Sequence, residues 1–527
     1  MARTASPADR KRRGVYYTPL DVVDRLLDLS LDPVLDECGG SVERVRALRV
    51  LDPAAGSGNF LVAAGDRIRR RLEDLGLPAG EAAAAAFGEC LAGVDLDRAA
   101  LDRCAERLTG ASLGAVTQEE AGRRLLCADA FDAVAPEAFH LVVGNPPFLS
   151  QLATGTARAG EYSAQLRRRF GPAVAGLTDT AVLFLLLAVD AARPAGGVVC
   201  LIQPLSFLST RDAAGARAAV LGRAGLRAAW MSEDRVFDDA SVRVCAPVLV
   251  RGEAPPAVRL LRNRSFAAAG SVAPSDLGGA TWAALLAAAK GVPDRALRTQ
   301  GRVGDVASAT ADFRDQYYGL RGRVVDREDA DDADFPPLLT SGLLDPAHVW
   351  WGRRSTRFDK VAYRFPRVDV GSLEPPLREW ARRRLVPKLL LATQTKVLEA
   401  FVDGGGRFLP SVPVVTVTAG DEAELWRLGA LLSSPPVTML AARRHLGAAL
   451  SSEALKLRAA DVLELPLPAR AEAWQEAAGH FEQASAAPDA AARRQALLSA
   501  GRLMCAAFGL GDDAELVGWW QRRLPSP

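Results

Sequence analysis

The residues with the clearest chemical potential stand in a row, Asn145, Pro146, Pro147 and Phe148, after the apolar run 141–143 and a glycine. Two prolines fix φ and remove two backbone donors, so the segment cannot continue a central strand. It presents carbonyl oxygens, one side-chain amide and one aromatic ring at fixed positions. This set of groups is suited to holding a flat, polar group that contains nitrogen.

Three other predicted strands also end in residues that can bind a ligand. The first leads into Asp52-Pro53-Ala54-Ala55-Gly56-Ser57-Gly58-Asn59-Phe60, where glycines admit a ligand to the backbone and a following helix offers free N–H groups. The second ends at Asp95, where nucleotide-binding folds hold ribose hydroxyls. The third ends at Asp129-Ala130-Phe131, a carboxylate that can accept from an adenine amino group and a ring that can cover a base. A tight turn or a helix cap would explain each end alone, but their order and spacing favour a ligand site.

The elements that must position these ends alternate between strand and helix. The sequence predicts strands at 48–51, 91–94, 124–127, 141–143 and 198–202, and helices at 59–73, 98–108 and 180–192. This alternation predicts an α/β fold, a doubly wound, Rossmann-like parallel sheet covered on both faces, with right-handed crossovers. Ligands of such sheets bind at the carboxyl ends of the strands.

The length of 527 residues predicts two or three domains. The residue pattern changes after about residue 255, and the boundaries we expect are 1–255, a connecting segment 256–300, a mixed α/β domain 301–470 and a helical segment 471–527. In the second half, strands are predicted at 388–392 and 412–417, and helices at 422–432 and over much of 470–508.

Composition excludes several classes of protein. The seven cysteines form no CxxC, and none of the four histidines stands at metal-ligand spacing from another, which argues against disulfides, zinc and any other metal. The N-terminus lacks the apolar core of a signal peptide, and no apolar run is long enough to span a bilayer. We therefore expect a cytoplasmic protein. The net charge of +2 is nearly balanced, but residues 341–470 hold more Lys and Arg than Asp and Glu.

The four strand ends together resemble the gamma group of adenine-N6 DNA methyltransferases, which includes the TaqI-like enzymes. The segment Gly14-Val15-Tyr16-Tyr17-Thr18-Pro19 is similar to the first motif of that group, and residues 201–208 are similar to a later strand and loop. The resemblance covers roughly residues 14–250, and it implies a class I methyltransferase fold with S-adenosyl-L-methionine as cofactor. The residues implied to bind this cofactor are Tyr17, Thr18, Pro19, Asp52, Ala54, Gly56, Gly58, Asn59, Phe60, Asp95, Asp129, Ala130 and Phe131.

The same resemblance implies that Asn145, Pro146, Pro147 and Phe148 are catalytic. The adenine amino nitrogen is a poor nucleophile because its lone pair is delocalised into the ring. The Asn145 side-chain oxygen and the Pro146 carbonyl can accept its two N–H bonds and aim the lone pair at the methyl group. Phe148 would stack on an adenine flipped out of the duplex, and Phe237, in the segment 236–242, would also stack on it.

We expect a sequence-specific enzyme that binds double-stranded DNA through a target-recognition domain at 301–470. The expected DNA contacts are Arg353, Arg354, Arg357, Lys388, Lys396, Arg443, Arg444 and Lys456. Cognate restriction or defence proteins are the other expected partners, no membrane is involved, and the chain is expected to be a monomer.

Four alternatives stay open at this stage. One is an NPP-type methyltransferase that acts on RNA or on a protein glutamine, because that nitrogen is also planar. The second is a modification subunit with a separate specificity chain, although only 13 residues precede Gly14. The third is a fused restriction–modification enzyme, for which no nuclease motif is visible. The fourth is a non-catalytic DNA-binding defence component.

Overall fold

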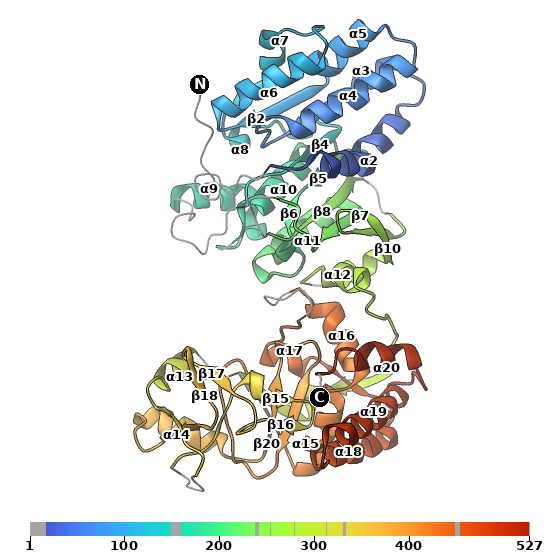
Figure 1. Ribbon diagram of the computed structural model, residues 1–527. Coiled ribbons are helices and arrows are strands. Elements are labelled where there is room, and N and C mark those ends of the chain that lie inside the picture. The colour runs from blue at the N-terminus through green and yellow to red at the C-terminus, as the bar shows by residue number, and fades with distance from the viewer. Residues whose placement is uncertain are drawn as a thin grey trace. The chain divides into compact units, whose positions relative to one another are not determined.

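The computed structural model describes residues 17–148, 160–176, 178–237, 242–252, 255–278, 280–311, 314–329, 334–447 and 454–525. The chain folds into two compact units, Met1–Lys290 and Gly291–Pro527. In Figure 1 the first runs from blue to yellow-green and the second from yellow to red. Each is described by itself.

The first unit is built on one large sheet with strand order β10-β9-β7-β8-β5-β4-β1-β2-β3, and β6 pairs with β8. Strands β3, β2, β1, β4 and β5 are parallel neighbours, whereas β8 is antiparallel to both β5 and β7. The strands are β1 (Val50–Asp52), β2 (Leu91–Asp95), β3 (Leu125–Cys127), β4 (Leu141–Gly144), β5 (Val198–Leu201), β6 (Gln203–Pro204), β7 (Ala224–Ser232), β8 (Val244–Arg251), β9 (Val258–Arg262) and β10 (Ala267–Val272).

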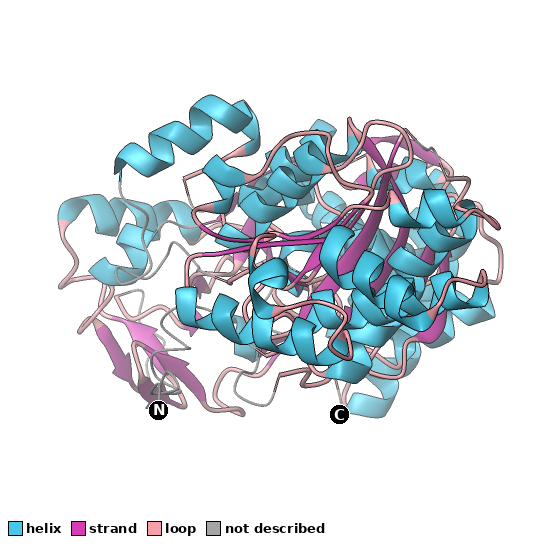
Figure 2. Ribbon diagram, turned by 90° about the horizontal axis from the view of Figure 1, so that it is seen from above, coloured by secondary structure: helices cyan, strands magenta, loops and turns pink. Residues whose placement is uncertain are grey.

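Helices surround these twisted strands, as Figure 2 shows from above. Every residue of β1, β4 and β5 is buried, which is the burial expected of parallel strands covered on both faces. The helices are α2 (Leu20–Glu37), α3 (Val42–Arg46), α4 (Asn59–Asp74), α5 (Ala79–Ala84), α6 (Arg98–Ala111), α7 (Gln118–Gly122), α8 (Ala130–Ala133), α9 (Gly160–Phe170), α10 (Thr180–Ala191), α11 (Ala214–Leu221) and α12 (Ala283–Ala289). The predicted α/β fold is confirmed, with small shifts at the ends of elements.

The first unit extends further than the boundary expected near residue 255. Strands β9 and β10 add to the edge of the large sheet, and α12 packs on them, so residues 256–290 belong to this unit and are not a connecting segment. Strand β7 was not predicted, because its sequence AGLRAAWMS is rich in residues that favour helices. Pairing with β8 along its whole length outweighs that local preference.

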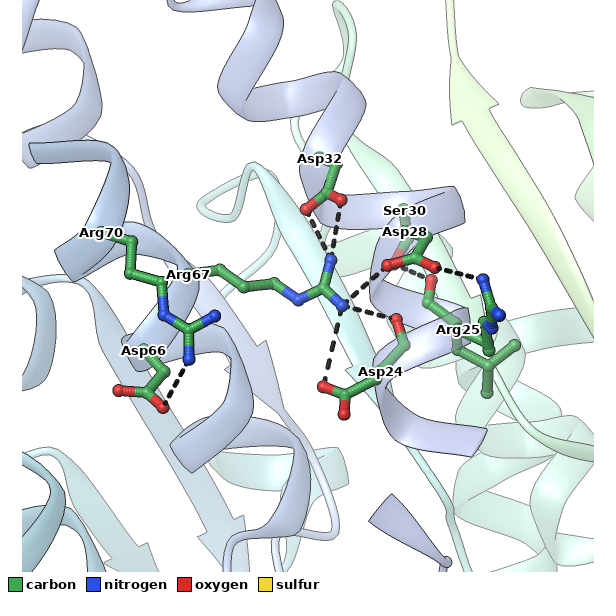
Figure 3. A network of polar contacts seen from close by, with 9 residues as sticks. Asp24, Arg25, Asp28, Ser30, Asp32, Asp66, Arg67 and Arg70 are labelled. Carbon is green, nitrogen blue, oxygen red and sulfur yellow. Dashed lines mark hydrogen bonds and ion pairs between the residues drawn. The ribbon is translucent and has the colours of Figure 1, made fainter. Parts of the chain in front are cut away.

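One arginine joins the two helices that begin beside the strand ends. Arg67 of α4 reaches the α2 residues Asp24, Asp28 and Asp32, as Figure 3 shows. Its guanidinium donates to both Asp32 carboxylate oxygens at 2.7 Å, to Asp28 Oδ1 at 2.8 Å and to the Asp24 carbonyl at 2.7 Å. The side chain is only 17% exposed, so these charge-assisted bonds fix α2 against α4.

The second unit holds a four-stranded antiparallel sheet with order β12-β23-β20-β21 and several two-stranded pairs. Its strands are β11 (Thr299–Arg302), β12 (Ala307–Ala311), β13 (Val324–Asp326), β14 (Leu338–Leu339), β15 (Leu344–Asp345), β16 (His348–Val349), β17 (Thr356–Phe358), β18 (Val361–Tyr363), β19 (Pro366–Val368), β20 (Lys388–Ala392), β21 (Glu399–Asp403), β22 (Leu409–Pro410), β23 (Val415–Ala419) and β24 (Pro466–Pro468). Its helices are α13 (Arg314–Gly319), α14 (Pro375–Arg384), α15 (Glu422–Leu432), α16 (Pro435–His445), α17 (Ala459–Leu463), α18 (Ala471–Ser485), α19 (Ala490–Ala507) and α20 (Ala514–Gln521).

The last helices are part of this second unit and do not form a separate segment. Helix α18 packs on α15, where the Trp474 indole donates to the Arg427 carbonyl at 2.7 Å. Gly429 of α15 lies so close to the Phe481 ring that a Cβ there would stand 2.5 Å from it. Of the helices in the described ranges, none is long and apolar enough to cross a membrane.

Candidate functional site

The carboxyl ends of four neighbouring parallel strands meet at one edge of the first unit's sheet, in the order β4, β1, β2, β3. Asp52 ends β1 and Asp95 ends β2, while Asp129 and Asn145 follow β3 and β4. The register places Asp52 beside Gly93 and Asp95 beside Cys127, so the four polar residues come from adjacent positions along this edge. The sequence predicted this convergence, and the fold provides it.

The glycine loop, residues 52–58, is held by carboxylates of its own unit. Asp95 Oδ2 accepts from the Gly56 N–H at 2.8 Å, and Asp95 Oδ1 accepts from the Asp97 N–H at 2.8 Å. Gly58 precedes α4 with φ +82°, and a Cβ there would stand 2.4 Å from Cys104 Sγ. A larger residue at Gly58 is therefore excluded both by conformation and by the packing of α6. No atom lies within 4 Å of a Cβ built at Gly56, so this side of the loop is open to a ligand.

Asp52 lies buried between the glycine loop and the strand that leads to Asn145. Its Oδ1 accepts from the Ala54 N–H at 3.0 Å, and the side chain of this residue is almost inaccessible. Burial raises the pKa of Asp52 to about 8, partly offset by the Ala54 N–H and reinforced by the charge of Asp95. A carboxyl group with this pKa favours a cationic ligand, whose charge would stabilise the ionised form.

The segment 17–19 lies beside the glycine loop and touches the NPPF segment, residues 145–148. The Thr18 carbonyl accepts from Asn59 Nδ2 at 2.9 Å, and Thr18 Oγ1 accepts from Asn145 Nδ2 at 3.0 Å. The Tyr17 hydroxyl accepts from Ser57 Oγ at 3.1 Å. Pro19 precedes the first residue of α2. Residues 14–16 of the same motif lie outside the described residues.

Arg107 of α6 is a site residue that the sequence reasoning missed. Its Nη1 donates to Asn59 Oδ1 at 2.6 Å and to the Ser57 carbonyl at 2.7 Å, and it lies 3.4 Å from the Tyr17 hydroxyl. Arg107 occupies the middle of a helix, in no recognisable motif, so no local signal marks it. Only the packing of α6 against the start of α4 brings it to the glycine loop.

The end of β3 is more enclosed than expected. Asp129 Oδ1 accepts from the Phe131 N–H and Asp129 Oδ2 accepts from the Tyr162 hydroxyl, both at 2.9 Å. The Phe131 ring is 7% exposed and packs edge-on against Phe184, with ring centroids 5.0 Å apart. The prediction that Phe131 covers a base therefore does not fit its position, because the ring belongs to the core. Ala130 is also buried.

Two further aromatic side chains predicted to bind ligands are buried. Phe60 is 2% exposed in the hydrophobic core, so only its backbone can contribute to the glycine loop. Phe237 is 1% exposed, and its ring lies 6.1 Å from that of Phe148, which is only partly buried. Phe237 thus supports Phe148 and does not present a face for stacking. Residues 238–241 of that segment lie outside the described residues.

The predicted DNA contacts differ in how accessible their side chains are in the structure. The prediction that Lys388 contacts DNA is wrong, because this side chain is fully buried. Its Nζ lies 2.6 Å from Oδ2 of Asp403, its cross-strand partner. Arg354 pairs with Asp345 at 3.3 Å and stacks on the Trp350 ring, and Arg443 pairs with Asp294 at 2.8 Å. The exposed members are Arg353, Arg357, Lys396, Arg444 and Lys456.

Comparisons with known proteins agree with this fold. Residues 1–262 match the family model described as N-6 DNA Methylase. None of the curated proteins compared with the chain matches it. Among solved structures, the chain is similar to the Type IIL restriction-modification enzyme MmeI in complex with DNA, with a TM-score of 0.61 and 12% identity over 99% of this chain and 80% of that one.

A second solved structure has a similar fold. It is a nuclease-deletion mutant of the Type ISP restriction-modification enzyme LlaGI in complex with a DNA substrate mimic, with a TM-score of 0.54 and 12% identity. The match covers 89% of this chain and 55% of the LlaGI chain. At this identity both likenesses describe the fold alone, and they extend over both units.

Proposed function

We propose, from the match of residues 1–262 to the family model described as N-6 DNA Methylase, that the chain methylates the N6 amino group of adenine at a specific DNA sequence. The observation that carries the proposal is the position of Asn145. It follows β4 directly, beside the glycine loop that follows β1, and it is linked through Thr18 to the segment that lies along that loop. One strand end thus brings an amide and two prolines to a nucleotide-type ligand site.

The chemistry at Asn145 requires hydrogen-bond acceptors at fixed positions. The Asn145 Oδ1 and the Pro146 carbonyl would each accept one N–H of the target amino group, drawing the nitrogen lone pair out of conjugation with the ring. Fixed dipoles of this kind stabilise positive charge that develops on the nitrogen, and they need no rearrangement during the reaction. Pro147 stiffens the segment, and the Phe148 ring, supported by Phe237, would stack on the flipped base.

The glycine loop fits S-adenosyl-L-methionine, which supplies an electrophilic methyl group on a cationic sulfonium. Gly56 leaves room for close approach, and Asp95 and Asp129 stand at the strand ends suited to ribose hydroxyls and to an adenine amino group. Buried Asp52, with its raised pKa, matches a ligand that carries positive charge. Tyr17, Thr18, Pro19, Ala54, Gly58 and Asn59 complete the proposed cofactor site.

We assign DNA recognition to the second unit, mainly to residues 301–470. The hairpin of β17 and β18 turns at Asp359 and Lys360, both with positive φ, and Arg357 of β17 points outward between two buried neighbours. With Arg353, Lys396, Arg444 and Lys456 it would contact phosphates or base edges. Restriction–modification is the setting we propose, since the two similar structures are restriction-modification enzymes.

The test is to express the chain in a host that lacks DNA methylation and to sequence the native genomic DNA for modified adenines. Wild type should methylate one sequence motif at nearly every occurrence, and Asn145→Ala should methylate none while it still binds S-adenosyl-L-methionine. The loss is confined to the rate because the amide acts on the transition state.

Two outcomes would overturn the proposal. The first is methyl transfer to RNA or to protein glutamine, in digests of the same cells, without modified DNA. The second is purified protein that binds neither the cofactor nor DNA, which would favour a scaffold with another role.

A further inference from the structure

The orientation of the Asn59 side chain is fixed by its two partners. Arg107 can only donate hydrogen bonds, so Asn59 Oδ1 must be the atom that faces Arg107 Nη1 at 2.6 Å. A backbone carbonyl can only accept, so Asn59 Nδ2 must face the Thr18 oxygen at 2.9 Å. Asn59 is 8% exposed and begins α4, so it holds the Thr18 backbone against a rigid element.

Arg107 is itself held by neutral acceptors. Its Nη1 also donates to the Ser57 carbonyl at 2.7 Å, and among the described residues it forms no ion pair. Its hydrogen bonds lead to the glycine loop, to Asn59 and to the segment 17–19.

Thr18 connects this arrangement to the NPPF segment. Its side chain is 5% exposed, and Oγ1 lies 3.0 Å from Asn145 Nδ2, across 127 residues of sequence. Because the amide nitrogen of Asn145 is turned toward Thr18, the amide oxygen is turned away from it. That oxygen is the atom which must accept from the target amino group in the proposed reaction.

We propose that Thr18 is a positioning residue for Asn145, and that Asn59 and Arg107 position Thr18. The inference deepens the proposed function and rests on it, since it assigns to Thr18 a role in methyl transfer beyond the cofactor contact implied by its motif. An amide can rotate about its last torsion, which is broad and roughly two-fold. The buried Thr18 hydroxyl, bonded to this amide, restrains the rotation and holds the Asn145 side chain in place.

The two roles of Thr18 make different predictions. A residue that only contacts the cofactor changes cofactor affinity, whereas a residue that positions Asn145 changes the rate at saturating cofactor and DNA. A small misplacement of a reacting group costs up to about 100-fold in rate. The isosteric Thr18→Val removes the hydroxyl and keeps the shape, and Thr18→Ser restores the hydroxyl.

The experiment measures kcat at saturating DNA and S-adenosyl-L-methionine, and the Kd of the cofactor, for full-length protein. Thr18→Val should lower kcat about 10- to 100-fold with a Kd within about threefold of wild type, and Thr18→Ser should keep most of the rate. Asn59→Asp retains the partner of Arg107 but places an acceptor against the Thr18 carbonyl, so it should lower kcat in the same way. Thr416→Val, at a buried threonine of β23, is the matched control and should keep the wild-type kcat.

A second readout does not depend on activity. Hydrogen exchange in the peptide 141–148 includes the backbone N–H groups of Asn145 and Phe148, since Pro146 and Pro147 have none. This exchange should be faster in Thr18→Val than in Thr18→Ser or wild type. A Thr18→Val protein with wild-type kcat and exchange would overturn the inference, as would one whose only change is weaker cofactor binding. If wild type methylates no DNA, the proposed function fails, and the exchange result still decides whether Thr18 holds the NPPF segment.

Discussion

Gly144 lies directly against the carboxyl group of Asp52. A Cβ at position 144 would stand 2.4 Å from Asp52 Oδ1 and 2.9 Å from its Cγ. The two residues end neighbouring parallel strands, β4 and β1, and Asn145 follows at once. The absence of a side chain at Gly144 therefore sets how closely the NPPF segment approaches the glycine loop.

Gly144→Ala should reduce methyl transfer strongly while the protein stays folded. The new methyl group must displace either the Asp52 carboxyl or the backbone that carries Asn145, and a displacement near 1 Å costs roughly 100-fold in rate. The rate of methyl transfer is measured in a single-turnover experiment on DNA that contains the recognition sequence. Gly122→Ala on α7, where a Cβ meets nothing within 4 Å, is the control and should behave as wild type. Equal rates for the two variants would contradict this account of Gly144.

Cofactor affinity should rise with pH up to about 8 and then level off. The pKa of Asp52 in the free protein is raised to about 8, so the carboxyl is protonated below that pH, and a cationic ligand must displace the proton in order to bind. Calorimetry in buffers of different ionisation enthalpy would detect the released proton. Asp52→Asn should bind more weakly and lose this part of the pH dependence. The same pH slope in Asp52→Asn would assign the titration to the cofactor's own amino group.

Glu399→Gln should stabilise the second unit, and more so at higher pH. Burial, reinforced by the charge of Asp345, raises the pKa of Glu399 to about 9. A folded-state pKa above the unfolded value contributes stability that is fully present below the unfolded pKa, near 4.3, and is lost as pH rises toward 9. The gain in thermal midpoint of Glu399→Gln over wild type should therefore grow between pH 5 and pH 8. Glu476→Gln, at an exposed position of α18, is the control, and a pH-independent gain would refute the argument.

Removing two exposed cations of the second unit should weaken DNA binding and flatten its response to salt. Each phosphate that the protein no longer neutralises reduces the steepness of log affinity against log salt by about one. We expect the pair Arg357→Gln and Lys396→Gln to show this in a titration of labelled duplex at several salt concentrations. Arg70→Gln, at an exposed position of α4 in the first unit, should leave the slope unchanged. A wild-type slope in the double variant would remove these two residues from the interface.

The sequence identified the site through local patterns. Strand ends, glycines and the NPPF segment are contiguous in sequence, and their meeting at one edge follows from parallel pairing alone. Asp52, Asp95, Asp129 and Asn145 could therefore be placed without the structure. The residues that support this site could not be predicted from the sequence. Arg107, for example, reaches Asn59 from another helix at a separation of 48 residues.

The same distinction between local pattern and packing explains two predictions that were wrong. Lys388 was expected to contact DNA, but it pairs with Asp403 across β20 and β21, and the register that joins them is not visible in the sequence. Phe237, in the first unit, was expected to be open to a base, but packing against distant strands leaves it only 1% exposed. A residue type indicates what a side chain can do, and its burial decides whether a partner can reach it.

The contacts of Arg67 have a consequence for how the site is lost on heating. Helices α2 and α4 begin at Leu20 and Asn59, next to the segment 17–19 and the glycine loop, and Arg67 joins them through three aspartates within the next turns. These bonds join α2 and α4 beyond their first turns, so the two helices cannot separate without breaking them. The segment 17–19 and the glycine loop, which precede these two helices, should therefore lose their arrangement together on heating, and a change at Arg67 would lower the temperature at which ligand binding is lost.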